Sequence, residues 1–225
     1  DEPEPEALLA LLQMTQARGD ARVSEDGELV LLADQDRSRW NVNLLAEGVS
    51  RATASLQRAT ATSQPDATAQ PDATAHPDAT THPDGATAGQ ATASPRGVGR
   101  FALQAAVAGL HVTAPSWEET DWHQVVRMYD AMLLSWPSPI VALNRAAALS
   151  FVPGADLTAI LEELDALSND PALKAYSYLP AARADVLARL NRPTEAIRAY
   201  DEAITLTAND PERRFLTRRR AALHP

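Results

Sequence analysis

Tyr178–Pro211 reads YLPAARADVLARLNRPTEAIRAYDEAITLTANDP, and this stretch decides the fold class. Two segments with helical periodicity flank the break Asn191-Arg192-Pro193. In the second segment, Ala196, Tyr200 and Ala203 are spaced so that all three lie on one face of a helix. The small alanine side chains on that face allow a neighbouring helix to approach closely. The sequence therefore predicts two helices that pack against each other.

This helix-turn-helix stretch resembles a tetratricopeptide repeat, a unit of about 34 residues that buries its apolar face by stacking on neighbouring units. Val125, Tyr129 and Met132 repeat the spacing of the later alanine-tyrosine face, and Pro137 ends that segment. We therefore expect two or three degenerate repeats. Such repeats favour a binding or regulatory scaffold over an enzyme.

The composition bounds the class of protein. Alanine is abundant and aromatic residues make up only 5% of the chain, which suits closely packed helices. The absence of cysteine excludes disulfides and thiolate metal sites, and it fits a reducing cytoplasm, where we expect the protein to work. The apolar runs are far too short for a membrane span. The net charge of −10 opposes non-specific binding to nucleic acid, and the missing initiator Met suggests a fragment of a longer protein.

The first part of the chain, residues 1–59, is predicted to form an N-terminal helical pair. One helix spans 3–18, and a second begins at a cap formed by Asp34 or Asp36 and runs to about Ala59. Residues 60–97 contain no bulky apolar side chain and repeat a Pro-Asp pair every six residues. Because such a segment cannot bury enough surface to offset its ordering entropy, it is predicted to be a disordered linker.

Residues 98–225 are predicted to form a tetratricopeptide-like helical domain. The expected helices span 100–113, 119–135, 138–151, 156–167, 173–190, 193–207 and 210–223. Short loops between them imply antiparallel neighbours. We expect the helix at 100–113 to complete the core of the N-terminal pair. The predicted fold class is all-α, an antiparallel bundle of tetratricopeptide-like repeats with a disordered linker insertion.

Motifs that signal catalysis or metal binding are missing from the sequence. There is no glycine-rich phosphate loop, no serine nucleophile elbow and no HExxH pattern. His76 and His82 fall in the predicted linker, while His111 and His123 fall on different predicted helices, where packed or half-exposed side chains are expected. We therefore predict a protein that is not an enzyme and that has no metal and no cofactor.

The densest polar cluster is ADQDRSRW at residues 33–40. One interpretation is a capped helix N-terminus with an exposed ion pair. The other is a docking surface, in which Trp40 is the anchor and Asp36, Arg37 and Arg39 contact a partner. Asn144 and Arg145 are further candidates, because they could line a groove and bind a peptide carboxylate.

The last predicted helix is rich in arginine. A cationic C-terminal turn favoured by the helix dipole explains this pattern, and an anionic partner, either an acidic protein surface or nucleic acid, is the alternative. The residues concerned are Arg213, Arg214, Arg218, Arg219 and Arg220.

Taken in order, the stretches Leu8–Asn41, Phe101–Leu149 and Tyr178–Arg219 resemble the C-terminal tetratricopeptide-like extension of a bacterial extracytoplasmic-function (ECF) RNA polymerase sigma factor. DQDRSRW, followed by DW and ALNRA, carries most of this resemblance. It implies a regulatory domain that modulates transcription initiation through contacts with sigma regions two and four of the parent protein, or with the RNA polymerase core. An Asp-x-x-Arg element is also implied, and both Asp36-x-x-Arg39 and Asp34-x-x-Arg37 fit it.

Sigma regions two and four are absent from this chain, so the resemblance implies contact with promoter DNA only through those absent regions. We expect no membrane partner. The alternative function is a stand-alone tetratricopeptide-type adaptor that binds peptides.

Overall fold

The computed structural model describes residues 2–63 and 98–223. Within these two ranges the regular secondary structure is helical, and the only β-type pairing is one isolated bridge between Val23 and Leu29. The predicted all-α fold class is confirmed. The predicted disordered linker, 60–97, lies outside the described residues from residue 64 onward, and residues 60–63 belong to a helix.

Most helix boundaries lie within a few residues of those expected. The α-helices are α1 (Pro3–Ala17), α2 (Val42–Ser63), α3 (Arg100–Thr113), α4 (Trp122–Ser135), α5 (Pro139–Leu149), α6 (Leu157–Leu167), α7 (Tyr178–Arg189), α8 (Pro193–Leu206) and α9 (Asp210–Ala221). Local caps explain this agreement. The Asp121 carboxylate accepts a hydrogen bond from the Gln124 amide (2.9 Å), and the Asp156 carboxylate accepts one from the Thr158 amide (2.9 Å).

The start of α2 differs from the prediction. Asp36 caps a short 3₁₀ turn, η3 (Arg37–Arg39), by accepting a hydrogen bond from the Ser38 amide, and it does not begin a long helix. Trp40 then has an extended backbone, and the Asn41 side chain accepts a hydrogen bond from the Leu44 amide (3.0 Å) at the start of α2. Trp40 therefore precedes α2, whereas a helix capped by Asp34 or Asp36 would have contained it.

The helix predicted at 173–190 is also shorter than expected. A 3₁₀ turn, η4 (Pro171–Leu173), comes first, and α7 begins only at Tyr178. Pro180 has no amide hydrogen and is tolerated only in the first turn of a helix, where amides have no intrahelical partner. The proline therefore limits how far α7 extends toward the N-terminus.

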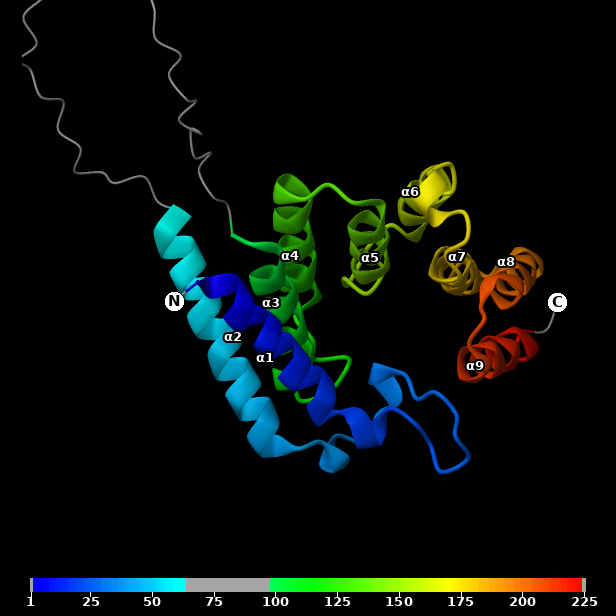
Figure 1. Cartoon of the computed structure of the whole chain (residues 1–225). Coiled ribbons are helices and arrows are strands. Elements are labelled where there is room, and N and C mark those ends of the chain that lie inside the picture. The colour runs from blue at the N-terminus through cyan, green and yellow to red at the C-terminus, as the bar shows by residue number, and fades with distance from the viewer. Residues whose placement is uncertain (1, 64–97, 224–225) are drawn as a thin grey trace, which may run out of the picture.

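Helices α1, α2 and α3 share one core. Small side chains from all three helices meet in it, together with one long side chain, and these residues are Ala7, Ala10, Met14, Ala52, Ala102 and Ala105. Figure 1 shows α1 and α2 side by side, with α3 next to them. The prediction that residues 100–113 complete the core of the N-terminal pair is confirmed.

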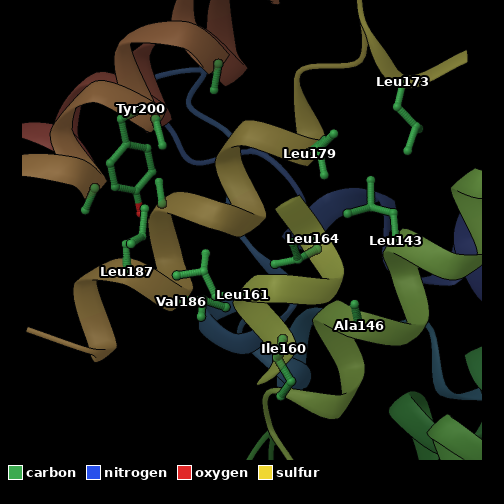
Figure 2. Close-up of a cluster of buried hydrophobic side chains, with 14 of the residues drawn as sticks. Leu143, Ala146, Ile160, Leu161, Leu164, Leu173, Leu179, Val186, Leu187 and Tyr200 are labelled. Atoms are coloured by element: carbon green, nitrogen blue, oxygen red, sulfur yellow. The ribbon is translucent and has the colours of Figure 1, made fainter. Parts of the chain in front are cut away.

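From α3 to α9, each helix packs on the next one in the chain, and the succession curves away from α1 and α2 (Figure 1). The largest buried apolar cluster joins α5 to α9 through leucine, isoleucine and alanine side chains (Figure 2). The predicted face of α8 is buried in it, since Ala196, Tyr200 and Ala203 are at most 3% exposed. The helix face predicted from Ala196, Tyr200 and Ala203 is therefore a face at which helices pack together.

Residues 18–41, which we call the strap, connect α1 to α2 and reach across the molecule. The Gly27 carbonyl accepts a hydrogen bond from Arg214 of α9 (3.0 Å), and the Glu28 carboxylate forms ion pairs with Arg214 and Arg218. Figure 1 shows the strap running below the row of helices toward α9. The strap therefore links the first and last parts of the described chain.

Candidate docking surface

Arg37 fastens the strap to the end of α3. Its Nη1 donates hydrogen bonds to the carbonyl oxygens of Ala114 (2.7 Å) and His111 (3.2 Å). These carbonyls belong to the C-terminal end of α3, where helix carbonyls lack partners of their own. The guanidinium also lies 4.5 Å from the ring centre of Trp40, which is only 6% exposed. Burial lowers the pKa of Arg37.

An aromatic row continues from this point. The His111 ring stacks on Trp117 at 5.6 Å, and Trp117 meets Phe151 edge-on at 5.2 Å. Trp122 lies beneath, 4.6 Å from Trp117 and 4.7 Å from Phe151. We call Arg37, His111, Trp117, Trp122, Phe151 and Arg189 the aromatic–arginine stripe.

Arg189 closes the far end of the stripe and repeats the role of Arg37. Its Nη2 donates a hydrogen bond to the Ser150 carbonyl (2.7 Å) at the end of α5, and its guanidinium lies 5.5 Å from the Phe151 ring centre. The stripe therefore runs from the end of α3, past the end of α5, to the last turn of α7. Phe151 is 36% exposed and Arg189 is exposed, so this end faces solvent.

The stripe is cationic at its strap end. Burial first, and then the positive charges of Arg18 and Arg37, lower the pKa of His111 to about 4, so the imidazole is neutral near pH 7. Burial also lowers the pKa of Arg18, with Arg22 and Arg37 adding to the effect. The Arg18 guanidinium is therefore close enough to those of Arg22 and Arg37 to be repelled by both.

The predicted docking residues of the DQDRSRW segment separate into two groups. Asp36 and Arg39 are exposed, and hydrogen bonds from Ser38 are the main cause of the lowered pKa of Asp36. Arg37 and Trp40 are instead occupied inside the molecule, where they join the strap to α3. Of the two overlapping Asp-x-x-Arg readings, Asp36-x-x-Arg39 is the one that leaves its arginine exposed. A partner-binding role for these residues stays a prediction.

The other predicted pair lies on α5, away from the strap segment. Asn144 is exposed. Arg145 donates to Asp130 of α4 (2.5 Å) and to Glu163 of α6 (3.3 Å), and the hydrogen bond to Asp130 is the first cause of its raised pKa. Because Arg145 already bridges two carboxylates, it is poorly placed to hold a peptide carboxylate as well.

The arginines of α9 are paired within the chain. Arg213 pairs with Asp210, Arg214 and Arg218 with Glu28, Arg219 with Asp185, and Arg220 with Asp201. These carboxylates come from α9, the strap, α7 and α8. These four carboxylates therefore offset most of the positive charge of α9, which disfavours the alternative that this helix binds nucleic acid directly.

A cavity of about 200 Å³ lies between α6, α7 and α8. Two ion pairs lie in its lining: Arg183 contacts Asp165 (2.7 Å), and Arg192 contacts Glu195 (2.6 Å). No histidine lines it. Among residues 2–63 and 98–223, no three His, Asp or Glu side chains are grouped as a metal site would require. None of the helices in these ranges is long and apolar enough to cross a lipid bilayer.

Sequence reasoning missed Trp117, Phe151 and Arg189. Aromatic residues make up only 5% of the chain. Trp117 lies in the loop after α3, where a core residue is not expected, and Phe151, expected as the last residue of the helix 138–151, follows the end of α5. The signal in the sequence that could have pointed to them is the position of these rare aromatic residues at the ends of successive helices. Their convergence depends on how α3, α5 and α7 align, and helical periodicity does not specify that alignment.

Comparison with known proteins gives two matches. Residues 1–56, which cover α1, the strap and most of α2, match the model of a family of unknown function, DUF6596. An uncharacterized protein of Rhizobium meliloti (strain 1021) is 32% identical over 215 residues, which cover 96% of this chain and 41% of that relative. The chain thus spans about two fifths of the relative's length. No solved structure matches the chain.

Proposed function

We propose that this chain is a regulatory interaction domain of an ECF sigma factor, one that modulates transcription initiation by binding the parent protein's sigma regions or the RNA polymerase core. The observation that carries the docking role is the aromatic–arginine stripe. Tryptophan, tyrosine and arginine dominate the residues that contribute most to protein interfaces, and partly buried aromatics lose little freedom on binding. The sigma-factor assignment draws on the resemblance of the DQDRSRW segment and the stretches that follow it.

Three features support protein contacts over other activities. The stripe offers packed aromatic surface with arginine at both ends. The cavity between α6, α7 and α8 holds two ion pairs and no histidine in its lining, which is not the arrangement of a base beside a nucleophile. The paired arginines of α9 and the net charge of −10 disfavour direct contact with promoter DNA. In the proposal, DNA is reached only through sigma regions outside this chain.

The length of the Rhizobium relative is compatible with the proposal. The chain spans 41% of that protein, which leaves room in it for regions beyond the part that matches. The stand-alone peptide adaptor gains less support, because Arg145 is held between Asp130 and Glu163.

A binding experiment tests the proposal. The 225-residue chain is immobilised and exposed separately to purified sigma region two, sigma region four and RNA polymerase core. We expect at least one of them to bind. The double variant Phe151→Ala/Arg189→Glu removes the exposed end of the stripe and should weaken binding at least ~10-fold, equivalent to about 1.4 kcal/mol. The charge-reversed variant Asp36→Arg/Arg39→Asp tests the strap in the same assay.

Arg127→Glu is the matched control, because Arg127 is an exposed arginine of α4 outside the stripe. It should bind as the unmodified chain does, and circular dichroism should show equal helicity for all variants. If none of the three proteins binds, the sigma-factor proposal is wrong. If binding survives both double variants, the stripe and the strap are not the docking surface.

A further inference from the structure

Four arginines of the strap are gathered on two short turns. The 3₁₀ turns η1 (Gly19–Ala21) and η3 contact each other, and the Asn41 amide donates a hydrogen bond to the Ala17 carbonyl (2.9 Å) at the same place. Arginines flank η1 and begin and end η3. We call these residues, Arg18, Arg22, Arg37 and Arg39, the arginine cluster.

The arginine cluster forms no ion pair with any described residue, whereas arginines elsewhere in the chain commonly do. Arg18 donates to the Met14 carbonyl (3.3 Å), and Arg37 donates to carbonyls of α3. By contrast, the arginines of α9 each find a carboxylate. In a chain with 30 acidic and 20 basic residues, grouped arginines without carboxylate partners are unexpected.

Other unfavourable features lie in the same region, where η3 packs against η1 and the end of α3. Gln35 Oε1, Trp40 Nε1 and His111 Nδ1 are buried without a hydrogen-bond partner in the described part of the chain. Unmade hydrogen bonds and like charges both reduce stability, and their concentration at one place is typical of a functional site. An anion bound there would relieve the repulsion among the guanidinium groups.

We propose that the arginine cluster binds an acidic segment of a partner protein, with an apolar residue of that segment resting on the exposed end of the aromatic–arginine stripe. Arg22 and Arg39 are exposed and supply direct contacts, while Arg18 and Arg37, which are half-buried, add charge from behind. This proposal rests on the docking function proposed above and names the chemistry of the docked partner.

The surroundings favour a short acidic peptide over a nucleic acid. Two exposed carboxylates lie beside the arginine cluster. Glu118 interacts electrostatically with Arg37, and Asp36 is the N-cap residue of η3. A duplex presents a continuous row of phosphates, which would meet these carboxylates as well as the arginines. A peptide with a few carboxylates can contact the guanidinium groups without meeting Glu118 or Asp36. Arginine and carboxylate groups commonly form such pairs through two parallel hydrogen bonds.

Fluorescence anisotropy with the full 225-residue chain tests the proposal. The probes are a labelled peptide of alternating Glu and Leu, its Gln/Leu counterpart, and a short DNA duplex. We expect the acidic peptide to bind at least ~10-fold more tightly than the Gln peptide, and its affinity to fall between about 50 mM and about 300 mM NaCl.

Variants should then act in opposite directions. Arg22→Glu/Arg39→Glu should weaken acidic-peptide binding at least ~10-fold, whereas Glu118→Gln, which removes the competing carboxylate, should tighten it about twofold. Arg127→Glu is the control and should change nothing.

Equal affinity for the acidic and Gln peptides, tighter binding to DNA, or an equal loss in the Arg127→Glu variant would each overturn the inference. No sigma region or polymerase enters this assay, so its result is separate from the test of the proposed function. If the polymerase or sigma contact depends on Phe151 while the acidic peptide fails to bind, the docking function stands and the acidic partner does not.

Discussion

Arg37 and Arg189 use the same chemistry at two helix ends. Each guanidinium donates to a carbonyl at the C-terminal end of another helix and lies against an aromatic ring. Helix C-termini leave carbonyls without partners, so such an arginine both satisfies them and complements the helix dipole. Sequence reasoning picked out Arg37 as a partner-binding residue because its dense polar surroundings are visible locally. Its acceptors lie more than seventy residues away and are not visible in the sequence.

At this scale we predict that His111 makes stability depend on pH. Burial first, then Arg18 and Arg37, lower its pKa from 6.5 to about 4, so between these values the unfolded chain binds a proton that the folded chain does not. The free energy of unfolding should therefore fall as the pH drops from 6.5 toward 4, by up to about 3 kcal/mol. Urea unfolding at several pH values measures it.

His111→Gln removes this titration and should show a flatter profile over the same range. His123→Gln, at an exposed position on α4, is the control and should keep the slope of the unmodified protein. Carboxylates titrate in all three proteins and cancel in the comparison. Equal slopes for His111→Gln and the unmodified protein would contradict the assignment of a buried, neutral imidazole.

Helices α1 and α2 approach closely because the residues between them are small. Gly48 of α2 is buried, and a β-carbon there would lie 2.8 Å from Met14 Cγ and 3.2 Å from the Ala10 carbonyl oxygen of α1. The first atom belongs to a flexible side chain, but the second is backbone and can shift only if the helix shifts. This contact sets how near the two helices lie, and so helps to place both ends of the strap.

Gly48→Ala should therefore destabilise the protein, although alanine is the better helix former. We expect overpacking to outweigh the propensity gain, with a net loss of about 1–2 kcal/mol in thermal or urea unfolding. Gly109→Ala in α3 is the matched control, because a β-carbon there meets nothing within 4 Å. That variant should gain about 0.5–1 kcal/mol. Stabilisation by both substitutions would show that α1 can move away at little cost.

Over the whole molecule, the strap joins the first helices to the last. Glu28 of the strap meets Arg214 and Arg218 of α9, and Arg214 also donates to the Gly27 carbonyl, 187 positions earlier in the chain. These groups are partly exposed, so each ion pair contributes little to global stability. Their effect is to hold the strap, and with it the arginine cluster, in one position against the curved row of helices.

We predict that Glu28→Gln loosens the strap without unfolding the protein. The free energy of unfolding should fall by less than about 1 kcal/mol, while amide hydrogen exchange in residues 22–31 should become faster. Mass spectrometry of exchanged peptides measures this. Asp201→Asn, which breaks an ion pair between α8 and α9, should leave exchange in the strap unchanged. Unaltered exchange in Glu28→Gln would mean that the ion pairs of Glu28 are not needed to hold the strap against α9.

Helix positions from α3 to α9 could be predicted because the forces that define them act over about four residues. Caps, prolines and apolar periodicity are local, so the seam of Ala196, Tyr200 and Ala203 and the all-α class follow directly from the residues. The path of the strap, the partners of Arg37 and the meeting of Trp117 with Phe151 depend on packing between segments distant in the chain. Ion pairs and ring contacts have no sequence period, so only the folded arrangement selects among the many carboxylates, carbonyls and rings available to each arginine.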